Sequence, residues 1–461
     1  MTVWDYSFTI RQFILDFAAV SALLLLATGL RRYVPLLQRY LVPNNLTAGF
    51  AGLLLGPEIL GLLDIAPDRM GVYVYHLLAL TFISVGLQRH DKKASRVAVN
   101  LGFIQIMSML LQAMIGLGVA LVIAYLINPA IIPQVGMLLP LSFANGPGLA
   151  YSVGQSWEAY GFEGAGPIGL TLAAIGFLVA YIVGMILVNR GIRRGETQIV
   201  QRAAMLDRDT RTGIVEQNEP EVGARLTTSS GAIEPLTYHL ALIGGIYFAT
   251  YFVVQGLAYG LVSAGMTREV PTLWSFHFLV ANGLALLIRR ILDRTDNARS
   301  IDDGFIQRTT GFFVDYLIAA SIMGVSLSVA WDYLAPIVVM AALATTGTYF
   351  GIRWASRRLF RDYPFERSVG MFGQMTGTIS SGLALLRVTD PRLTTTMAQD
   401  QALSTGFALL FGFPLLLAIN IPLSVFDGRM IGYWVCLGLF LAYAALLAFL
   451  WWRYNRRGAA A

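Results

Sequence analysis

Two short polar stretches interrupt an otherwise apolar chain, and each contains one neutral amide among glycines. The first, "FANGPG" at 143–148, contains Asn145, and the second, "FGQMTG" at 372–377, contains Gln374. A neutral amide offers its carbonyl oxygen to a cation or its N–H groups to a carboxylate. The alternative is that both amides only cap the ends of broken helices. Because the same residue class recurs in both stretches, we favour direct contact with a bound ion or a small anion.

Glycines and hydroxyl groups beside the two amides extend these candidate sites. Glycine allows close backbone approach or positive φ, and serine and threonine oxygens suit a hard cation. For any single hydroxyl, a hydrogen bond back to its own helix is the favoured alternative. The predicted substrate-binding residues here are Asn145, Gly146, Gly148, Ser152, Gln374, Thr376, Gly377 and Thr378, and the candidate Na⁺ ligands are Asn145, Gln374, Ser380 and Ser381.

Three further polar residues stand in apolar surroundings. Arg387, in "LALLRVTD", could pair with a substrate carboxylate, although an interfacial position at the end of the segment is favoured. Asn420, in "LAINIPL", is an amide inside an apolar run, where it is costly without partners, and it is also predicted to bind substrate. Asp315 is favoured as an interfacial or ion-paired residue over a coupling site.

The composition indicates a membrane protein. Of 461 residues, 56% are hydrophobic and 13% charged, and the mean hydropathy is +0.63. The single cysteine, Cys436, permits no internal disulfide, and the four histidines lack the spacing of metal ligands. The sequence contains neither a phosphate-binding loop nor a nucleophile–base pair, so we expect no enzymatic activity, no cofactor and no direct ATP drive. The net charge of +6 is spread over short loops, which indicates orientation signals and no nucleic-acid partner.

Apolar runs of about 18 residues or more predict membrane spans. They fall near 13–30, 43–63, 71–87, 97–127, 163–189, 236–264, 271–291, 309–331, 333–352, 398–425 and 430–452. Most of the 33 lysines and arginines lie in alternate loops, which places the N-terminus outside and the C-terminus in the cytoplasm. The polar stretch 190–235 is expected to be a charge-balanced cytoplasmic linker between two membrane halves.

The two halves repeat each other. Val42–Pro43 matches Val270–Pro271, "FANGPG" matches "FGQMTG", and Gly176–Phe177 matches Gly406–Phe407, at offsets of 228 to 230 residues. Five spans in the first half require the second half to enter the membrane from the opposite side. The predicted fold is therefore an all-α membrane protein with two inverted repeats, 1–189 and 236–425, and one extra span with a basic tail at 426–461.

The polar stretches near 141–157 and 368–390 lie between the fourth and fifth spans of each half and are too short to cross twice. We expect each to enter the membrane and turn back as a re-entrant hairpin, because such backbone is tolerated only inside protein or beside water. Secondary transporters place their substrate sites near the midplane, where discontinuous segments of two repeats meet.

With these features the sequence resembles the glutamate:sodium symporter family of bacterial inner-membrane carriers. The resemblance rests on "VPNNLTAGFAGLLL", "TFISVGL", the stretch from "FANGPG" to "VGMIL", "VPTLWSFHFLVANGL" and "FGQMTGTISSG", and covers most of 13–421. It implies a homodimeric, Na⁺-coupled carrier in the bacterial inner membrane, whose hairpins move with the substrate. Where the family has Gly-Gly-His-Gly-Thr-Gly, this chain has Ala144-Asn145-Gly146-Pro147-Gly148, without the histidine.

The expected function is secondary active transport of a small organic anion, such as glutamate or a related amino acid or carboxylate, driven by Na⁺. The alternatives are an H⁺-coupled or uncoupled carrier, an exporter or a channel-like protein on the same fold. A more distant alternative is an intramembrane enzyme or sensor, which needs a reactive pair of side chains that the sequence does not display.

Overall fold

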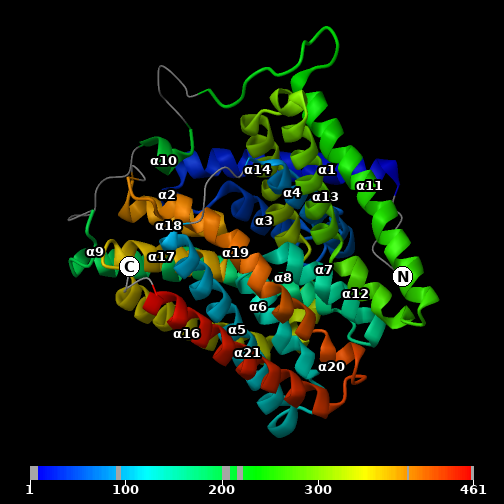
Figure 1. The fold of residues 1–461 in the computed structure, drawn as a ribbon, viewed down its shortest axis with the longest axis vertical. Coiled ribbons are helices and arrows are strands. Elements are labelled where there is room, and N and C mark those ends of the chain that lie inside the picture. The colour runs from blue at the N-terminus through cyan, green and yellow to red at the C-terminus, as the bar shows by residue number, and fades with distance from the viewer. Residues whose placement is uncertain (1–8, 90–94, 200–207, 215–221, 392–393, 458–461) are drawn as a thin grey trace.

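The computed structural model describes residues 9–89, 95–199, 208–214, 222–391 and 394–457, and these residues form helices and loops without a β-strand (Figure 1). Eight helices in this part of the chain are long and apolar enough to cross a membrane. They are α1 (Ile10–Tyr33), α4 (Pro67–Leu87), α5 (Arg96–Leu126), the continuous run of α8 (Ala165–Leu178), a π-helical turn and α9 (Gly184–Arg193), α11 (Pro235–Ser263), α16 (Leu334–Leu359), α19 (Met397–Ala418) with α20 (Ile421–Ser424), and α21 (Met430–Arg457). The chain is therefore an all-helical, multi-pass membrane protein.

Local sequence explains where the longest helices begin. Thr9 and Gln12 form a reciprocal capping box at the start of α1. The Ser95 hydroxyl accepts the Ala98 N–H at the start of α5, which then continues for 31 residues without a proline. The predicted span 271–291 is a bent pair. The segment Thr267–Ser275, which ends with α12 (Val270–Ser275), and α13 (His277–Arg294) meet at a bend of 61°.

Two predicted spans differ from the helices that form. The run 43–63 contains α3 (Asn44–Leu55), a helix of only 12 residues that ends at Gly56, because Pro57 follows. The run 309–331 is divided between α14 (Asp303–Met323) and α15 (Leu327–Asp332). Polar residues such as Asp303, Arg308 and Asp315 keep α14 outside the set of strongly apolar helices.

The helices pack as two groups, and each half of the sequence contributes to both. In the first group α4 packs against α13 and α14, α14 also contacts α3, and α1 and α11 flank these helices. In the second group α5 packs against α16 and α19, and α21 lies along α5 (Figure 1). Helices α7 (Pro147–Trp157) and α8 contact both groups, because they touch α4, α12, α14 and α16.

Both predicted hairpin segments are pairs of short helices separated by a break. In the first, α6 (Leu138–Phe143) follows a 3₁₀ turn at Pro133–Met137 and is separated from α7 by residues 144–146; a second 3₁₀ turn, Glu158–Tyr160, follows α7. In the second, α17 (Pro364–Thr376) and α18 (Ile379–Thr389) are separated by Gly377 and Thr378. Glycines bring α17 and α18 into close contact, since a Cβ atom on Gly373 would lie 2.8 Å from the Gly382 Cα atom.

Helix α9 ends at Arg193, and α11 begins at Pro235. In the described part of the chain between them, α10 (Arg208–Thr212) forms and contacts α2 (Pro35–Arg39). Two 3₁₀ turns, Thr267–Glu269 and Asp296–Ser300, precede α12 and follow α13. Parts of the predicted linker, 200–207 and 215–221, lie outside the described residues.

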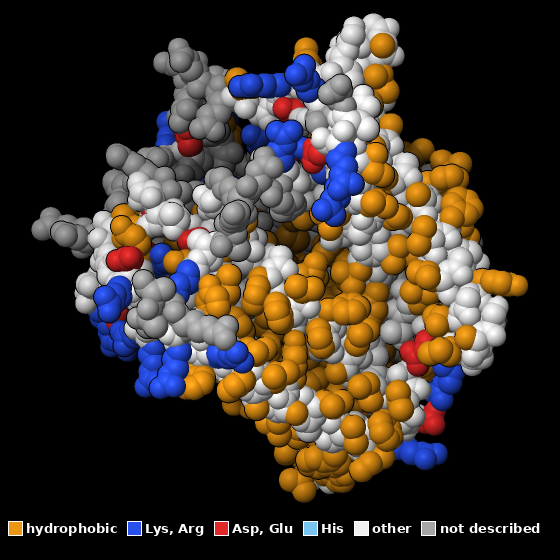
Figure 2. Space-filling model, in the orientation of Figure 1, with side chains coloured by type: hydrophobic (Ala, Val, Ile, Leu, Met, Phe, Trp, Pro, Cys, Tyr) orange, Lys and Arg blue, Asp and Glu red, His pale blue; other side chains and the backbone are white. Residues whose placement is uncertain are grey.

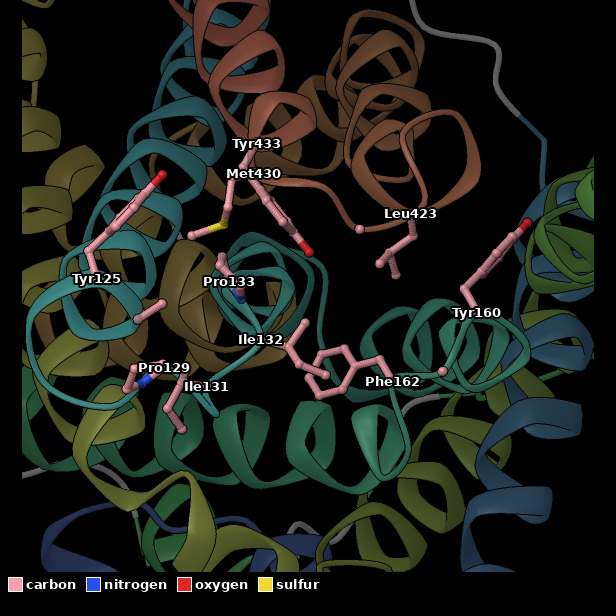
Figure 3. A pocket seen from close by; sticks show the side chains of 13 residues that line it. Tyr125, Pro129, Ile131, Ile132, Pro133, Tyr160, Phe162, Leu423, Met430 and Tyr433 are labelled. Atoms are coloured by element: carbon pink, nitrogen blue, oxygen red, sulfur yellow. The ribbon is translucent and has the colours of Figure 1, made fainter.

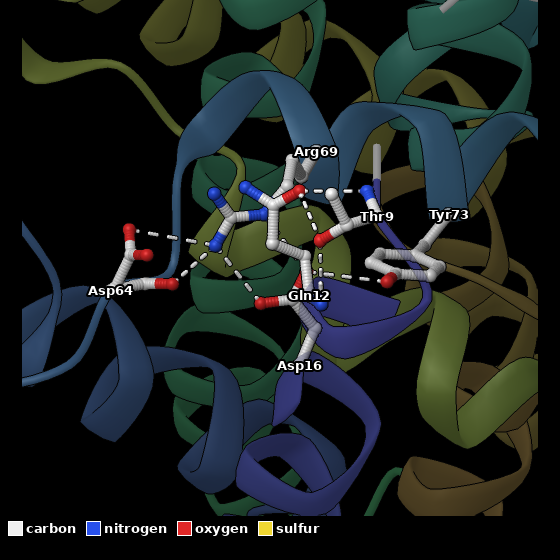
Figure 4. A network of polar contacts seen from close by, with 6 residues as sticks. All are labelled: Thr9, Gln12, Asp16, Asp64, Arg69 and Tyr73. Carbon is white, nitrogen blue, oxygen red and sulfur yellow. Dashed lines mark hydrogen bonds and ion pairs between the residues drawn. The ribbon is translucent and has the colours of Figure 1, made fainter. Parts of the chain in front are cut away.

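A buried ion pair fixes the start of α4 to α1 (Figure 4). Arg69 donates from Nε to Asp16 at 2.9 Å and from Nη2 to the other carboxylate oxygen at 3.1 Å. The Tyr73 hydroxyl donates to the same carboxylate, and the Arg69 guanidinium also donates to the Asp64 carbonyl. Both charged side chains are almost fully buried, so this pair is a structural joint.

The outer surface suits a bilayer. Figure 2 shows apolar side chains continuous over the lower centre of one face, whereas arginines, lysines and carboxylates gather toward its upper and left margins, with a smaller group at the lower right. Helices α1, α11 and α21 keep most of their apolar side chains on the outside. Such a large exposed apolar surface is expected where lipid replaces water.

Candidate functional site

The breaks of the two hairpin segments lie next to each other, with Gly146 and Gly377 buried and Asn145 exposed. A Cβ atom placed on Gly146 would lie 3.4 Å from the Thr378 Cγ2 atom and 3.9 Å from the Gly377 carbonyl oxygen. Gly146 has φ +83° and ψ 177°, a conformation that is essentially restricted to glycine. Two segments about half the chain apart therefore lie side by side at the positions where their helices are interrupted, so close that one added methyl group on Gly146 would reach the other segment. We call this meeting point the junction.

Two helices have their N-termini at the junction. Helix α7 starts after Gly146 and α18 starts after Thr378, and neither of these residues makes a side-chain capping hydrogen bond. The first N–H groups of a helix have no intrahelical acceptor, and its N-terminus carries a partial positive charge. Two such ends side by side favour an anion between them.

Oxygen atoms gather at the same place. Helices α6 and α17 both end at the junction, so their last carbonyl groups lie there too. The Gln374 Oε1 and Thr378 Oγ1 atoms are buried and have no hydrogen-bond partner. The Gln374 amide nitrogen donates to the Thr405 hydroxyl at 3.3 Å, which fixes the orientation of the amide. Neutral oxygens of this kind are ligands for a hard monovalent cation.

The side-chain amides of Gln374 and Asn145 differ in burial and in hydrogen bonding. Gln374 is 4% exposed, and its carbonyl oxygen is available inside the protein. Asn145 is exposed, and its side-chain nitrogen donates to the Pro140 carbonyl at 2.9 Å, at the end of α6. This contact is the capping interaction that the sequence left open as an alternative, while the Asn145 carbonyl oxygen stays a predicted ligand.

The predicted hydroxyl ligands divide in a similar way. Thr376 donates back to the Phe372 carbonyl at 2.8 Å, as expected of a helical threonine, and Ser152 donates to the Ser275 carbonyl at 2.7 Å. Ser381 is buried; its hydroxyl approaches the Tyr181 phenol without reaching hydrogen-bonding geometry. Ser380 is exposed on the first turn of α18. Thr378 and Ser381 are thus the buried hydroxyls nearest to the break that retain bonding capacity.

The remaining glycines allow close packing around the junction. A Cβ atom on Gly148 would lie 2.6 Å from the Leu78 Cδ1 atom of α4, and one on Gly377 would lie 2.7 Å from the Ser381 Oγ atom. The first turn of α7 is therefore held directly against the first helix group. Side chains at either position would separate the elements that form the junction.

Arg387 and Asn420 lie away from the break itself. Arg387 is exposed on α18, within electrostatic range of Arg31 at the end of α1. Asn420 accepts the Trp157 indole N–H at 2.7 Å and donates to the Leu416 carbonyl at 3.0 Å. Since Trp157 is at the opposite end of α7 from Gly146, Asn420 connects the far end of the hairpin segment to α19. Asp315, the other weighed residue, accepts a hydrogen bond from Asn45 at 2.8 Å.

Sequence reasoning missed Gln112, whose position on α5 brings it to the end of α17. Its amide nitrogen donates to the Met375 carbonyl at 2.8 Å, and the residue is fully buried. The available signal was a neutral amide inside a span of 31 residues, which is costly unless it has a partner.

Two cavities lie elsewhere in the described part of the chain. One of about 590 Å³ is lined mainly by apolar and aromatic side chains, among them Ile132, Phe162 and Leu423, and the Tyr433 hydroxyl points toward its centre (Figure 3). The other, of about 350 Å³, lies between α1, α3 and α14 and is lined by Arg31, Asn45 and Asp315. The predicted substrate and Na⁺ residues line neither cavity. In the described residues, His, Cys, Asp and Glu form no group of three or more that could hold a metal ion.

The sequence matches no protein-family model, and no curated protein is similar to it.

Proposed function

We propose that this protein is a secondary active transporter that couples the uptake of glutamate, or of a related small organic anion, to Na⁺. The single observation that carries the proposal is that Gly146 and Thr378, at the breaks of two interrupted segments from different halves of the chain, lie beside each other. Interrupted helices that meet inside a membrane protein form the substrate and ion sites of secondary transporters.

The anion is expected at the helix N-termini. Helices α7 and α18 direct their positive N-terminal ends toward the junction; α7 begins with Pro147, so its free N–H groups start at Gly148. A carboxylate there accepts main-chain hydrogen bonds and relieves the repulsion between two positive helix ends. Arg387 contributes positive charge from the same helix, α18, without being at the break.

The cation is expected at the oxygen-rich side of the junction. Gln374 Oε1 and Thr378 Oγ1 are buried without hydrogen-bond partners, and the last carbonyls of α17 are close to them along the chain. The last carbonyls of α6 precede the neighbouring break at 144–146. A bound Na⁺ would satisfy these oxygens, and its charge would lower the cost of bringing an anion into the membrane. Coupling between the two ions follows from this mutual stabilisation.

The two helix groups support an elevator-type movement. Both hairpin segments and α5 belong to, or contact, the second group, while Pro43 and Pro271 lie at the starts of α3 and α12 near the first group. We propose that the second group carries the junction along the membrane normal, while the first group is stationary and forms a homodimer. Inward- and outward-facing structures without relative displacement of the groups would exclude this movement.

The proposed location is the bacterial inner membrane, with the N-terminus outside and the linker and C-terminus in the cytoplasm. Ser229 is exposed in the linker, so it offers a position for labelling. In a Cys436→Ser background, Ser229→Cys should resist an impermeant maleimide added to intact cells. Rapid labelling would reverse the proposed orientation.

The alternatives differ in what drives transport. An H⁺-coupled or uncoupled carrier, an exporter or a channel-like protein would use the same junction without Na⁺. An intramembrane enzyme or sensor would convert or detect the ligand without moving it.

The test is uptake of a panel of labelled amino acids and dicarboxylates into proteoliposomes, under an imposed Na⁺ gradient, an imposed proton gradient or neither. We expect concentrative uptake of glutamate or a related anion only with inward Na⁺. Uptake driven equally by a proton gradient, or equilibration without any gradient, would replace Na⁺ symport with one of the alternatives.

A further inference from the structure

The cavity of about 590 Å³ is built from separate segments of the chain that come together at one end of the helices (Figure 3). These segments are the end of α5, residues 129–133, the turn at 160–162, α20 with the loop that follows it, and the start of α21. The described residues that line the cavity carry no charged side chain. A mostly apolar cavity of about 300–1,000 Å³ with few polar groups is typical of a small-molecule site.

One hydroxyl group directed into this cavity has no hydrogen-bond partner. Tyr433 is fully buried, and its hydroxyl points toward the centre of the cavity without making a hydrogen bond (Figure 3). The Gln134 main-chain N–H approaches the oxygen without reaching hydrogen-bonding geometry, so the hydroxyl hydrogen has no acceptor. A buried polar group without a partner is costly, and a ligand oxygen beside Tyr433 would remove that cost.

Part of the cavity rim belongs to the apolar outer surface. Tyr125, which lines the cavity at the end of α5, is 53% exposed, and Leu126 and Ile127 after it are exposed as well. At the start of α21, Ile431 is exposed next to the lining residue Met430. In a membrane protein, large apolar side chains on the outside face lipid. A ligand that enters past these side chains therefore comes from the bilayer.

Another part of the rim is charged. The Arg268 guanidinium donates to the carbonyl of the lining residue Leu423 at 3.5 Å, and it lies 5.9 Å from the ring centre of Tyr160. Arg268 also forms an ion pair with Asp427, and both side chains are more than half exposed. This pair is electrically neutral and marks the side of the cavity that faces water.

Arg429 adds one positive charge to this rim. It lies between Gly428 and Met430, which both line the cavity, and its side chain is exposed. Within the described residues Arg429 makes no side-chain hydrogen bond or ion pair. An arginine of this kind can bind a phosphate group through two parallel hydrogen bonds. The cavity thus combines an apolar interior, one buried hydroxyl and a cationic rim.

We propose that this cavity binds one phospholipid of the surrounding bilayer. An acyl chain fills the apolar interior, a glycerol-ester carbonyl accepts the Tyr433 hydroxyl, and the phosphate lies beside Arg429. Met430 is on the same face of α21 as Tyr433, and a rotamer change of its flexible side chain admits the ester. The lipid would contact Pro133 before α6 and Phe162 after α7, so it would brace both ends of the first hairpin segment. The site is independent of the proposed transport function, since binding requires no transport.

Photolabelling locates the lipid. The full-length protein is reconstituted into vesicles of phosphatidylethanolamine and phosphatidylglycerol that contain a small fraction of a phospholipid with a diazirine at the end of one acyl chain. Irradiation should label the peptides that line the cavity, and Ala124→Phe, which fills part of it, should reduce this labelling at least about fivefold. Val122→Phe is the matched control, because Val122 is exposed on the same helix, and it should leave the labelling unchanged. Equal labelling in both variants, or labelling spread evenly over the apolar surface, would overturn the site.

Thermal unfolding in detergent tests the hydroxyl. Without phospholipid, Tyr433→Phe should be at least as stable as the unmodified protein, because it removes a buried hydroxyl that has no partner. Added phosphatidylethanolamine should raise the Tm of the unmodified protein, and the rise should be at most about half as large in Tyr433→Phe. Tyr443→Phe is the control on the same helix: its hydroxyl donates to the Phe411 carbonyl, so the Tm should fall but the rise with lipid should persist. An undiminished rise in Tyr433→Phe would overturn the contact between the hydroxyl and the ester.

Arg429→Gln tests the phosphate. The apparent affinity for phosphatidylethanolamine, measured from the concentration dependence of the Tm rise, should fall about 5- to 10-fold in this variant. Diacylglycerol, which has the same acyl chains and esters but no phosphate, should bind the unmodified protein and Arg429→Gln with the same weaker affinity. If diacylglycerol instead bound the unmodified protein as tightly as the phospholipid did, or if Arg429→Gln had no effect, the assignment of a phospholipid would be wrong.

Discussion

Gln112 on α5 donates its side-chain amide to the Met375 carbonyl at 2.8 Å and to the Thr348 hydroxyl at 3.1 Å. The Met375 carbonyl is among the last of α17, and the break at Gly377 leaves it without a helical partner. A side chain from the first half of the chain therefore supports the interrupted helix of the second half.

Replacing Gln112 by leucine should lower both stability and ligand affinity. The Met375 carbonyl would be buried without a donor, at a cost of about 1–3 kcal/mol, and the end of α17 would lose its fixed position. Thermal unfolding and half-saturating substrate concentration measure the two effects. Gln134→Leu is the matched control, because Gln134 is equally buried and donates to the Ile419 carbonyl at 2.8 Å. Gln134→Leu should lower stability by a similar amount but leave the affinity unchanged. Equal affinity losses in both variants would show that Gln112 has no specific effect on the ligand site.

Gln374→Ser should weaken binding more than Asn145→Ser. Shortening Gln374 withdraws a buried oxygen that has no other partner, and the expected loss is about 5- to 150-fold in apparent affinity for Na⁺ or substrate. Serine at Asn145 can still cap α6, so a smaller effect is expected unless the exposed amide also contacts ligand. Concentration dependence of uptake distinguishes the two. Wild-type values for Gln374→Ser would remove this residue from the proposed Na⁺ site.

The Asp16–Arg69 pair should behave as a structural unit. Arg69→Met leaves a carboxylate buried without its partner, which typically costs about 3–5 kcal/mol. Replacing both residues, as Asp16→Leu with Arg69→Met, should cost less than either single change. Thermal unfolding of the three variants gives the comparison; additive losses would mean that the two side chains act independently.

Asp390 should make stability depend on acid pH. Burial acts to raise the pKa of this carboxyl, but hydrogen bonds from the N–H and hydroxyl groups of Thr395 and Thr394 outweigh it, and the pKa is lowered. The folded state therefore favours the carboxylate. Its contribution is fully present above the unfolded pKa of about 3.9 and is lost as pH falls through the lower folded value.

Asp390→Asn is the corresponding variant. It should be less stable than the unmodified protein near pH 7, and the difference should shrink as pH is lowered below about 4. Thermal unfolding at several pH values measures it. A difference that stays constant down to pH 3 would show that ionisation of Asp390 does not contribute.

The positions of the helix breaks could be predicted from sequence, whereas their partners could not. Glycine, proline and polar side chains between apolar runs predict a helix break from local sequence alone. The breaks at 144–146 and 377–378 therefore fall inside the predicted hairpin segments. That Gly146 lies beside Thr378 depends on packing between distant segments, which local composition does not determine. Gln112 was missed for the same reason.

Hydropathy also overestimated one span for a local reason. The run from Pro43 to Leu63 is apolar enough to cross a membrane, but Gly56 and Pro57 end α3 after 12 residues. Similarly, Asn420 in an apolar run indicated a binding residue. In the structure its side-chain oxygen accepts a hydrogen bond from Trp157, and its side-chain nitrogen donates one to the Leu416 carbonyl. An amide in a membrane helix signals that a partner exists, and only the fold shows whether the partner belongs to the protein.

A cryo-electron microscopy structure of the protein in lipid nanodiscs with Na⁺ and glutamate tests the central claim most directly. We expect ligand density at the junction, with carboxylate oxygens about 2.7–3.2 Å from N–H groups in the first turns of α7 and α18, and an ion beside Gln374 and Thr378. If a substrate identified by uptake instead occupied the cavity lined by Tyr433 or the one lined by Asp315, with the contact between Gly146 and Thr378 unchanged and empty of ligand, the assignment of the junction as the transport site would be contradicted.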